Sequence, residues 1–239
     1  MRVRAAIIAA ATWLAACAAQ QGGGPLHELG VPAPGTAGVA GTVRLVPHEG
    51  APSHPDGGGY GDRRLHDVRF VDYSKPDSCV VYLDVAGRPG GLAHLAVEES
   101  LSGVRLSPRL AVVGVAGEVV IENRAPGAVV VSLPAVDRVE RIEAGAELRV
   151  RAERAGPLEV FVLGADQPAR VWVSPGPWAR PDASGRYALT DLPPGRFTLR
   201  AWHPRLPASA AVVELRPDAV AHADFELGVG RSTGGHDAH

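Results

Sequence analysis

The chain has 239 residues, of which 46% are hydrophobic and 5% aromatic, and it carries 29 glycines, 21 prolines and a formal net charge of −2. This charge and the lack of a long basic block exclude the usual nucleic-acid-binding class, which needs a clustered cationic surface. The apolar content is sufficient for a core, and the many glycines and prolines favour short strands joined by turns over long helices.

The N-terminus has the pattern of an export signal. Two arginines precede an apolar stretch at residues 5–16, which is too short to cross a bilayer as a mature helix. Residues 14–17, LAAC, resemble the bacterial lipobox. The resemblance implies that residues 1–16 are a lipoprotein signal peptide and that an acylated Cys17 anchors the protein to a lipid bilayer. An ordinary cleaved signal with an incidental cysteine is the alternative.

The expected location is therefore the cell envelope, with the protein held by lipid. Ala18 and Ala19 follow the cysteine, and no aspartate does. By resemblance to the sorting of bacterial lipoproteins, this favours the outer membrane. Residues 17–38 are small, polar and rich in Gly and Pro, so we expect a flexible tether between the lipid and the fold.

Residues 39–175 are expected to form a β-sandwich with a long loop at 48–76. Runs of alternating hydrophobicity recur at intervals of about 10 residues between turn signals, which is typical of an all-β sandwich. Cys79 lies in one such run, CVVYLDV, and is expected to be a buried, unreactive thiol. The expected strands are 38–47, 68–73, 79–85, 92–98, 109–115, 118–123, 128–134, 138–144, 147–153, 157–164 and 169–175.

Residues 176–228 are expected to form a further β-sandwich, or an extension of the first. The segment 185–204, GRYALTDLPPGRFTLRAWHP, contains two alternating runs separated by a Pro-Pro-Gly turn, where Gly195 can adopt a positive φ. AAVVELRPD and VAHADFEL supply two more strands. The tail, 229–239, lacks apolar residues to order it and is expected to be disordered.

This second region resembles a known module. DASGRY (182–187), DLPPG (191–195) and LRAWHP (199–204) occur in the order found in the carboxypeptidase regulatory-like domain, a transthyretin-like β-sandwich. The resemblance covers about residues 172–227. It implies a non-catalytic accessory module.

The Trp-His-Pro ending also resembles a group of exported bacterial proteins called methylamine utilisation proteins, in which a cupredoxin-like sandwich precedes this module. CVVYLD, VVIENRAPGAVVVSLP and PLEVFVLGADQPARVWVSPGPWA resemble strands of that group. The resemblance implies a cupredoxin-like sandwich at 39–175. The whole chain is then all-β, with two consecutive β-sandwiches, cupredoxin-like and then transthyretin-like.

The residues that a type-1 copper site needs are missing from the expected positions. Such a site uses two histidines and a cysteine, usually with an axial methionine. The segment from Asn123 to Leu133 has no histidine, and 157–175 has no Cys, His or Met. Cys79 and His94 lie on the wrong strands. We therefore expect a cupredoxin scaffold without copper, and no cofactor.

Three histidines in the long loop leave a metal-handling alternative open. His48, His54 and His66 lie near aspartates, and imidazole and carboxylate groups suit zinc or copper. Their spacing matches no standard site, and polar loops often collect such residues. His203 follows Trp202 within the module's own motif, and we expect a structural role for it.

Aromatic residues near the boundary between the two regions leave a second alternative open. They can stack on sugar rings and form a carbohydrate-binding surface, or they can hold the two domains together. The residues are Trp172, Trp178, Trp202 and Tyr187. No nucleophile elbow, metalloprotease pair or phosphate-binding loop is present, so we expect no enzyme.

The leading hypothesis is a non-catalytic, lipid-anchored envelope protein that binds or scaffolds an unidentified protein or glycan. The alternatives are copper or zinc handling or electron transfer in the periplasm, and carbohydrate binding.

Overall fold

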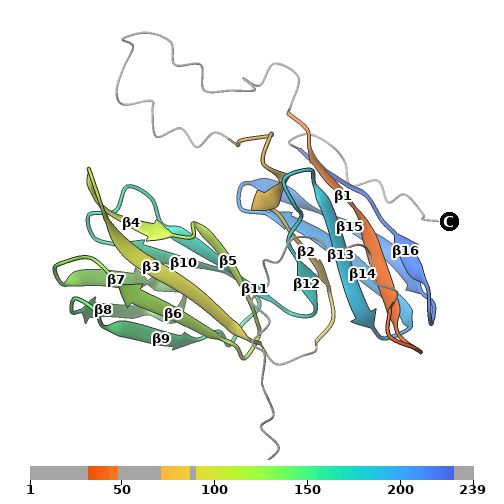
Figure 1. The fold of residues 1–239 in the computed structure, drawn as a ribbon, viewed down its shortest axis with the longest axis horizontal. Coiled ribbons are helices and arrows are strands. Elements are labelled where there is room, and N and C mark those ends of the chain that lie inside the picture. The colour runs from red at the N-terminus through yellow and green to blue at the C-terminus, as the bar shows by residue number, and fades with distance from the viewer. Residues whose placement is uncertain (1–31, 48–70, 87–89, 229–239) are drawn as a thin grey trace, which may run out of the picture.

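The computed structural model describes residues 32–47, 71–86 and 90–228 (Figure 1). The predicted signal peptide, Cys17, most of the tether, the tail and the three loop histidines His48, His54 and His66 lie outside these residues. The described chain is all-β, with two short 3₁₀ turns at Pro76–Ser78 and Pro134–Val136. Within it, no helix is long and apolar enough to cross a membrane.

One sandwich is built from residues in the middle of the chain and packs two sheets face to face. Its first sheet has the order β4-β3-β6-β9, in which β3 and β6 are parallel. Its second sheet has the order β5-β11-β10-β7-β8, in which β5 and β11 are parallel. The strands are β3 (Leu92–Ser100), β4 (Gly103–Ser107), β5 (Leu110–Gly114), β6 (Glu118–Asn123), β7 (Val129–Leu133), β8 (Arg138–Ile142), β9 (Glu147–Arg151), β10 (Gly156–Val162) and β11 (Ala169–Ser174).

Alternation along these strands produces the core. In β9, Leu148 and Val150 are buried, whereas Glu147, Arg149 and Arg151 are exposed. Successive side chains of a strand point to opposite faces, so one face packs inward and the other meets water. The same rule in both sheets gives one continuous apolar core between them, which includes Leu95, Ile121, Val131, Val160 and Val171.

The other sandwich combines strands from both ends of the described chain. One sheet has the order β13-β1-β16, with β17 also paired to β1, and the other has the order β12-β2-β14-β15. The strands are β1 (Ala37–Leu45), β2 (Val80–Leu83), β12 (Trp178–Ala179), β13 (Arg186–Leu192), β14 (Gly195–His203), β15 (Leu206–Leu215), β16 (Val220–His222) and β17 (Phe225–Leu227). Its separate core includes Val39, Leu83, Tyr187, Leu199 and Phe225.

The domain boundaries predicted from sequence are therefore wrong for the first two strands. Both were assigned to the 39–175 sandwich, yet β1 pairs with β13, β16 and β17, and β2 pairs with β12 and β14. The middle sandwich is an insertion between β2 and β12, and the two regions are not consecutive. Alternation shows which face of a strand is buried, but it does not identify the strand's partners. The strand expected at 68–73 is also wrong where it is described, because residues 71–73 are not in a strand.

The end of β2 lies beside the segment that leads back from the insertion to β12. The Leu83 amide donates to the Pro177 carbonyl at 3.0 Å. Gly176 packs so tightly that an added Cβ would lie 2.6 Å from the Leu83 carbonyl oxygen. These contacts hold the end of β2 and the segment before β12 together where the inserted sandwich joins the other one.

The turn in DLPPG forms as expected. Asp191, next to the end of β13, has a φ of 55°, and Gly195, the first residue of β14, has a φ of 145°. The run VAHADFEL is divided into β16 and β17, and between them the Ala223 carbonyl lies close to Gly41 in β1. This carbonyl accepts a hydrogen bond of 2.5 Å from the Tyr187 hydroxyl.

Candidate functional site

The tryptophans form an interface between the two sandwiches. The rings of Trp172 in β11 and Trp202 in β14 are stacked, with centroids 4.2 Å apart and planes inclined by 25°. The ring of Tyr82 in β2 also lies against Trp172, and the centroids of these two rings are 5.3 Å apart. Val80, Leu110, Val112 and Trp178 complete the cluster. β5 and β11 of the inserted sandwich thereby pack on β2, β12 and β14 of the other (Figure 1).

The aromatic residues expected at the boundary do not all lie there. Trp172, Trp178 and Trp202 belong to the interface, but Tyr187 is in the core of the second sandwich and is 2% exposed. Trp172 is 7% exposed and its Nε1 has no hydrogen-bond partner among the described residues. Buried rings present no face to a sugar, so a carbohydrate surface would depend on the half-buried Trp178 and Trp202 alone. The geometry favours the reading that these tryptophans hold the two domains together.

His203 is buried at the same junction. Its Nδ1 accepts a hydrogen bond of 3.1 Å from the Arg205 amide, and the residue is 6% exposed. Burial, followed by the nearby charges of Arg205 and Arg170, lowers the pKa of His203 from 6.5 to about 4. A histidine that is neutral and bonded to backbone is part of the structure, as the sequence motif predicts.

Two loops from the segments in which the sequence was searched for copper ligands lie at one end of the inserted sandwich. The Leu163 amide donates to the Val130 carbonyl at 2.9 Å, so the β10–β11 loop lies beside the start of β7. Neither residues 124–128 nor residues 163–168 include a His, Cys or Met. A type-1 copper ion needs nitrogen and sulfur donors, and these loops offer none.

Asn123 organises this end of the sandwich. The residue is completely buried, and its Nδ2 donates to the carbonyls of Gly127 at 2.8 Å and Ile142 at 3.0 Å. Its Oδ1 accepts from the Ala125 amide at 3.0 Å. All these partners are backbone groups, so the side chain closes the β6–β7 turn and leaves no polar atom directed at a ligand.

Cys79 is a free and fully buried thiol, as expected. Burial raises its pKa to about 12, with a further contribution from the charge of Asp77. Such a thiol is protonated at neutral pH and is therefore a poor nucleophile. Among the described residues, no group of three or more His, Cys, Asp and Glu side chains is close enough together to hold a metal ion.

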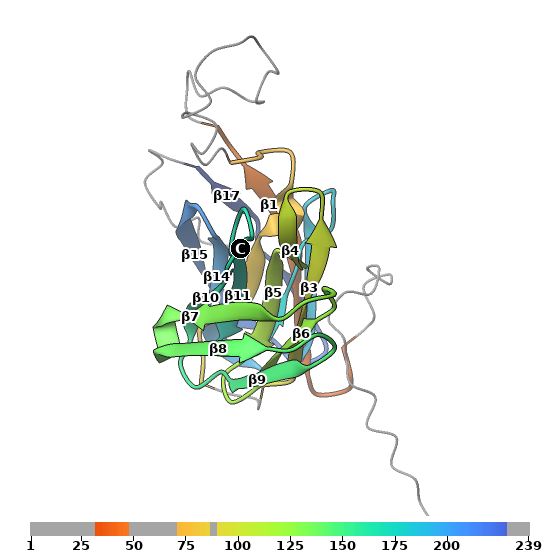
Figure 2. The same ribbon diagram turned by 90° about the vertical axis from the view of Figure 1, so that its left-hand side faces the viewer.

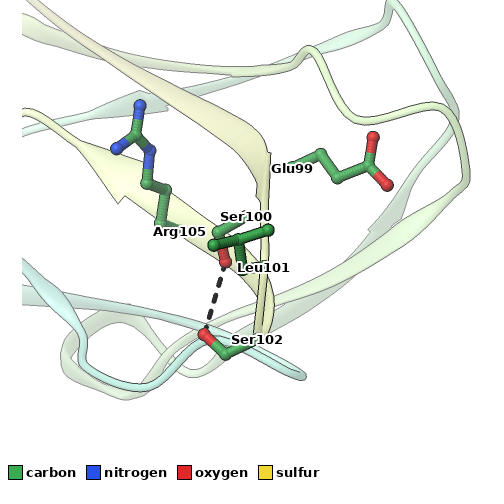
Figure 3. A pocket seen from close by; sticks show the side chains of 5 residues that line it. All are labelled: Glu99, Ser100, Leu101, Ser102 and Arg105. Carbon is green, nitrogen blue, oxygen red and sulfur yellow. Dashed lines mark hydrogen bonds between the residues drawn. The ribbon is translucent and has the colours of Figure 1, made fainter.

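A hollow in the surface lies at the tip of the β3–β4 hairpin (Figure 3). It is lined by Glu99, Ser100, Leu101, Ser102 and Arg105, which the sequence reasoning did not single out. Arg105 is directed to Glu98, with its Nη2 donating at 2.9 Å, and the Ser102 hydroxyl donates to Asp166 at 3.0 Å. Arg105 and Ser102 are thus directed to carboxylates outside the lining, and Leu101 at the tip is fully exposed, so these groups do not converge on one point in the hollow.

No family model and no curated protein matches the chain. Among solved structures, the chain is similar in part to the "Novel Purple Cupredoxin from Nitrosopumilus maritimus". The identity is 15% and the TM-score is 0.30, and the similarity covers 34% of this chain and 99% of that chain. At this level of identity the similarity gives no information about a ligand.

Proposed function

We propose that the chain is a non-catalytic, lipid-anchored binding or scaffolding protein of a bacterial cell envelope. In this proposal a cupredoxin-like sandwich without copper ligands is inserted into a transthyretin-like module, which receives the anchored N-terminus. The partner is a protein or glycan of the envelope.

One observation carries the proposal. Among the described residues, the buried polar side chains are those of Asn123, Ser174 and His203, and each bonds to backbone atoms. An active site needs polar groups that converge on an open space and are held there for a reacting atom. These three side chains fix turns and strand ends instead.

The position of the anchor gives a second argument. The lipobox-like LAAC at residues 14–17 is followed by a short tether and then by β1. β1 is hydrogen-bonded on both sides, to β13 and to β16 and β17. A strand inside a sheet transmits the restraint of an anchor to the folded module without exposing an edge.

The proposal is tested on the full chain, purified in detergent. We expect mass spectrometry to find acyl groups on Cys17, and expect Cys17→Ser to release the protein from membranes. We also expect Cu(II) to produce no intense visible absorption band. An intensely coloured site with one copper per chain would overturn the proposal in favour of electron transfer.

A variant lacking the three loop histidines separates metal handling from the proposed role. If the triple variant His48→Ala, His54→Ala, His66→Ala loses a stoichiometric zinc or copper ion that the wild-type chain holds, metal handling is the better reading. Equal metal contents in both proteins remove that alternative.

A further inference from the structure

The strand β15 is the longest in the described chain and lies at the edge of its sheet. It has 10 residues, and in the part of the chain that the structure describes it pairs with β14 alone. Its register with β14 runs from Leu206 opposite His203 to Leu215 opposite Gly195. Figure 2 shows β15 at the margin of the sheet, beside β14. Half of its backbone amides and carbonyls therefore point away from β14, along an open edge.

This edge is uncharged over most of its length. Residues 206–213 read LPASAAVV, and the first charge within the strand is Glu214. Ala208 and Val212 are exposed, and Val212 keeps 45% of its surface accessible. Pro207 blocks pairing only near one end, so the segment 208–213 has no residue that prevents another strand from pairing with it.

The other edges of the described sheets are protected. The edge strand β8 carries Arg138, Glu140 and Arg141, and the edge strand β9 carries Glu147, Arg149 and Arg151. β4 and β13 also carry charged residues, and β12 and β16 have only two and three residues. β5 has no charge, but all its residues are buried. Among these edge strands, β15 alone is long and accessible and carries an uncharged run at residues 206–213.

We propose that β15 is a dimerisation strand that pairs antiparallel with β15 of a second copy of this chain. A two-fold axis at Ala210 places Ala210 of the two copies opposite each other and Ala208 opposite Val212 of the partner copy. Small side chains at the axis allow the backbones to approach, and the exposed Val212 gains a partner. Glu214 then faces Leu206 of the other copy, so no like charges oppose each other.

The dimer joins the four-stranded sheets of both copies into one continuous sheet, with the same surface used by each. A second copy fits better than an unrelated extended peptide because the strand is self-complementary around Ala210 in size and in charge. The inference does not depend on the proposed function or on acylation of Cys17. Anchoring two copies to one membrane would raise their effective concentration and favour the dimer.

The first test is sedimentation equilibrium of the full chain in a density-matched detergent. We expect a reversible dimer whose dissociation constant rises about tenfold or more in Ala210→Lys, because two ammonium groups then oppose each other at the axis. The matched control is Val139→Lys, which places the same charge on an exposed valine of another edge strand and should leave the dimer unchanged. A monomeric wild-type chain, or a dimer that Ala210→Lys does not weaken, overturns the proposal.

Oxidation of a cysteine variant tests the same axis without adding charge. Opposed residues of an antiparallel pair have Cβ atoms about 4.5–5.5 Å apart, close to the span of a disulfide. Mild oxidation should therefore cross-link Ala210→Cys into a dimer on a non-reducing gel, whereas Val139→Cys should stay monomeric. Equal cross-linking of both variants overturns the proposal, and this result remains decisive if Ala210→Lys fails to fold.

Discussion

Lowering the pH from 7 to 5 should destabilise the protein through one residue, His203. Its pKa in the folded chain is about 4, compared with 6.5 for an ordinary histidine. Between these values the unfolded chain binds a proton that the folded chain does not, so stability falls as the pH falls. One pKa unit corresponds to about 1.36 kcal/mol, so the loss is about 2 kcal/mol at pH 5 and about 3 kcal/mol near pH 4.

Urea unfolding at several pH values between 7 and 5 measures this slope. The range stops at pH 5 because Asp182 and Asp224 have lowered pKa values and add their own acid sensitivity at lower pH. The variant His203→Asn supplies an amide oxygen to the Arg205 amide and cannot be protonated, so its stability should be nearly constant over the same range. His222→Asn, which makes the same substitution at an exposed histidine, is the matched control. Parallel pH profiles for the wild type and His203→Asn would refute the reasoning.

Three further substitutions test the packing, each by calorimetry. Gly41→Ala should lower the free energy of unfolding by about 1–3 kcal/mol, because its Cβ would lie 1.8 Å from the Ala223 carbonyl oxygen. An unchanged Tm would contradict this close contact between Gly41 and Ala223. Trp202→Ala should lower the free energy of unfolding by about 2–4 kcal/mol and divide unfolding into two transitions. Phe161→Ala, which lies outside the interface, is the control and should keep one transition. Asn123→Ala should lower the free energy of unfolding by about 3 kcal/mol, because it removes the three hydrogen bonds of this buried side chain. A loss below about 1 kcal/mol would show that the β6–β7 turn forms without the Asn123 side chain.

Strand positions were largely predictable from the sequence, because alternation is a local signal. The run ELRVRAE, for example, became β9 with the expected face buried. The sheet that a strand joins is a long-range property, and β1 illustrates it. Its partners β16 and β17 follow it by more than 170 residues, and nothing in its own sequence distinguishes them from nearer strands. β4 was missed because its five residues, GVRLS, include a glycine and only two apolar side chains.

The candidate site was predictable where it depended on which residue types are present. The lack of copper donors in two loops follows from the sequence, and so does the structural role of His203. The grouping of Tyr187 with the tryptophans was wrong, although a signal was available. Tyr187 alternates with Leu189 in β13, which assigns both to one buried face. The stack of Trp172 on Trp202 needed the structure, because it joins strands of different sandwiches.

The insertion changes what the proposed anchor and the interface would mean for function. Were the two sandwiches consecutive, the proposed tether would lead into the sandwich that is inserted, and the other sandwich would be an appendage. Because β1 and β2 belong to the second sandwich, the proposed tether would lead into that unit, and the inserted sandwich is held by two chain connections and the tryptophan cluster. Two connections and a shared apolar interface resist rotation far better than one linker. This arrangement suits the proposed scaffold, in which the inserted sandwich is held rigidly on the second sandwich and β15 of the second sandwich pairs with another copy.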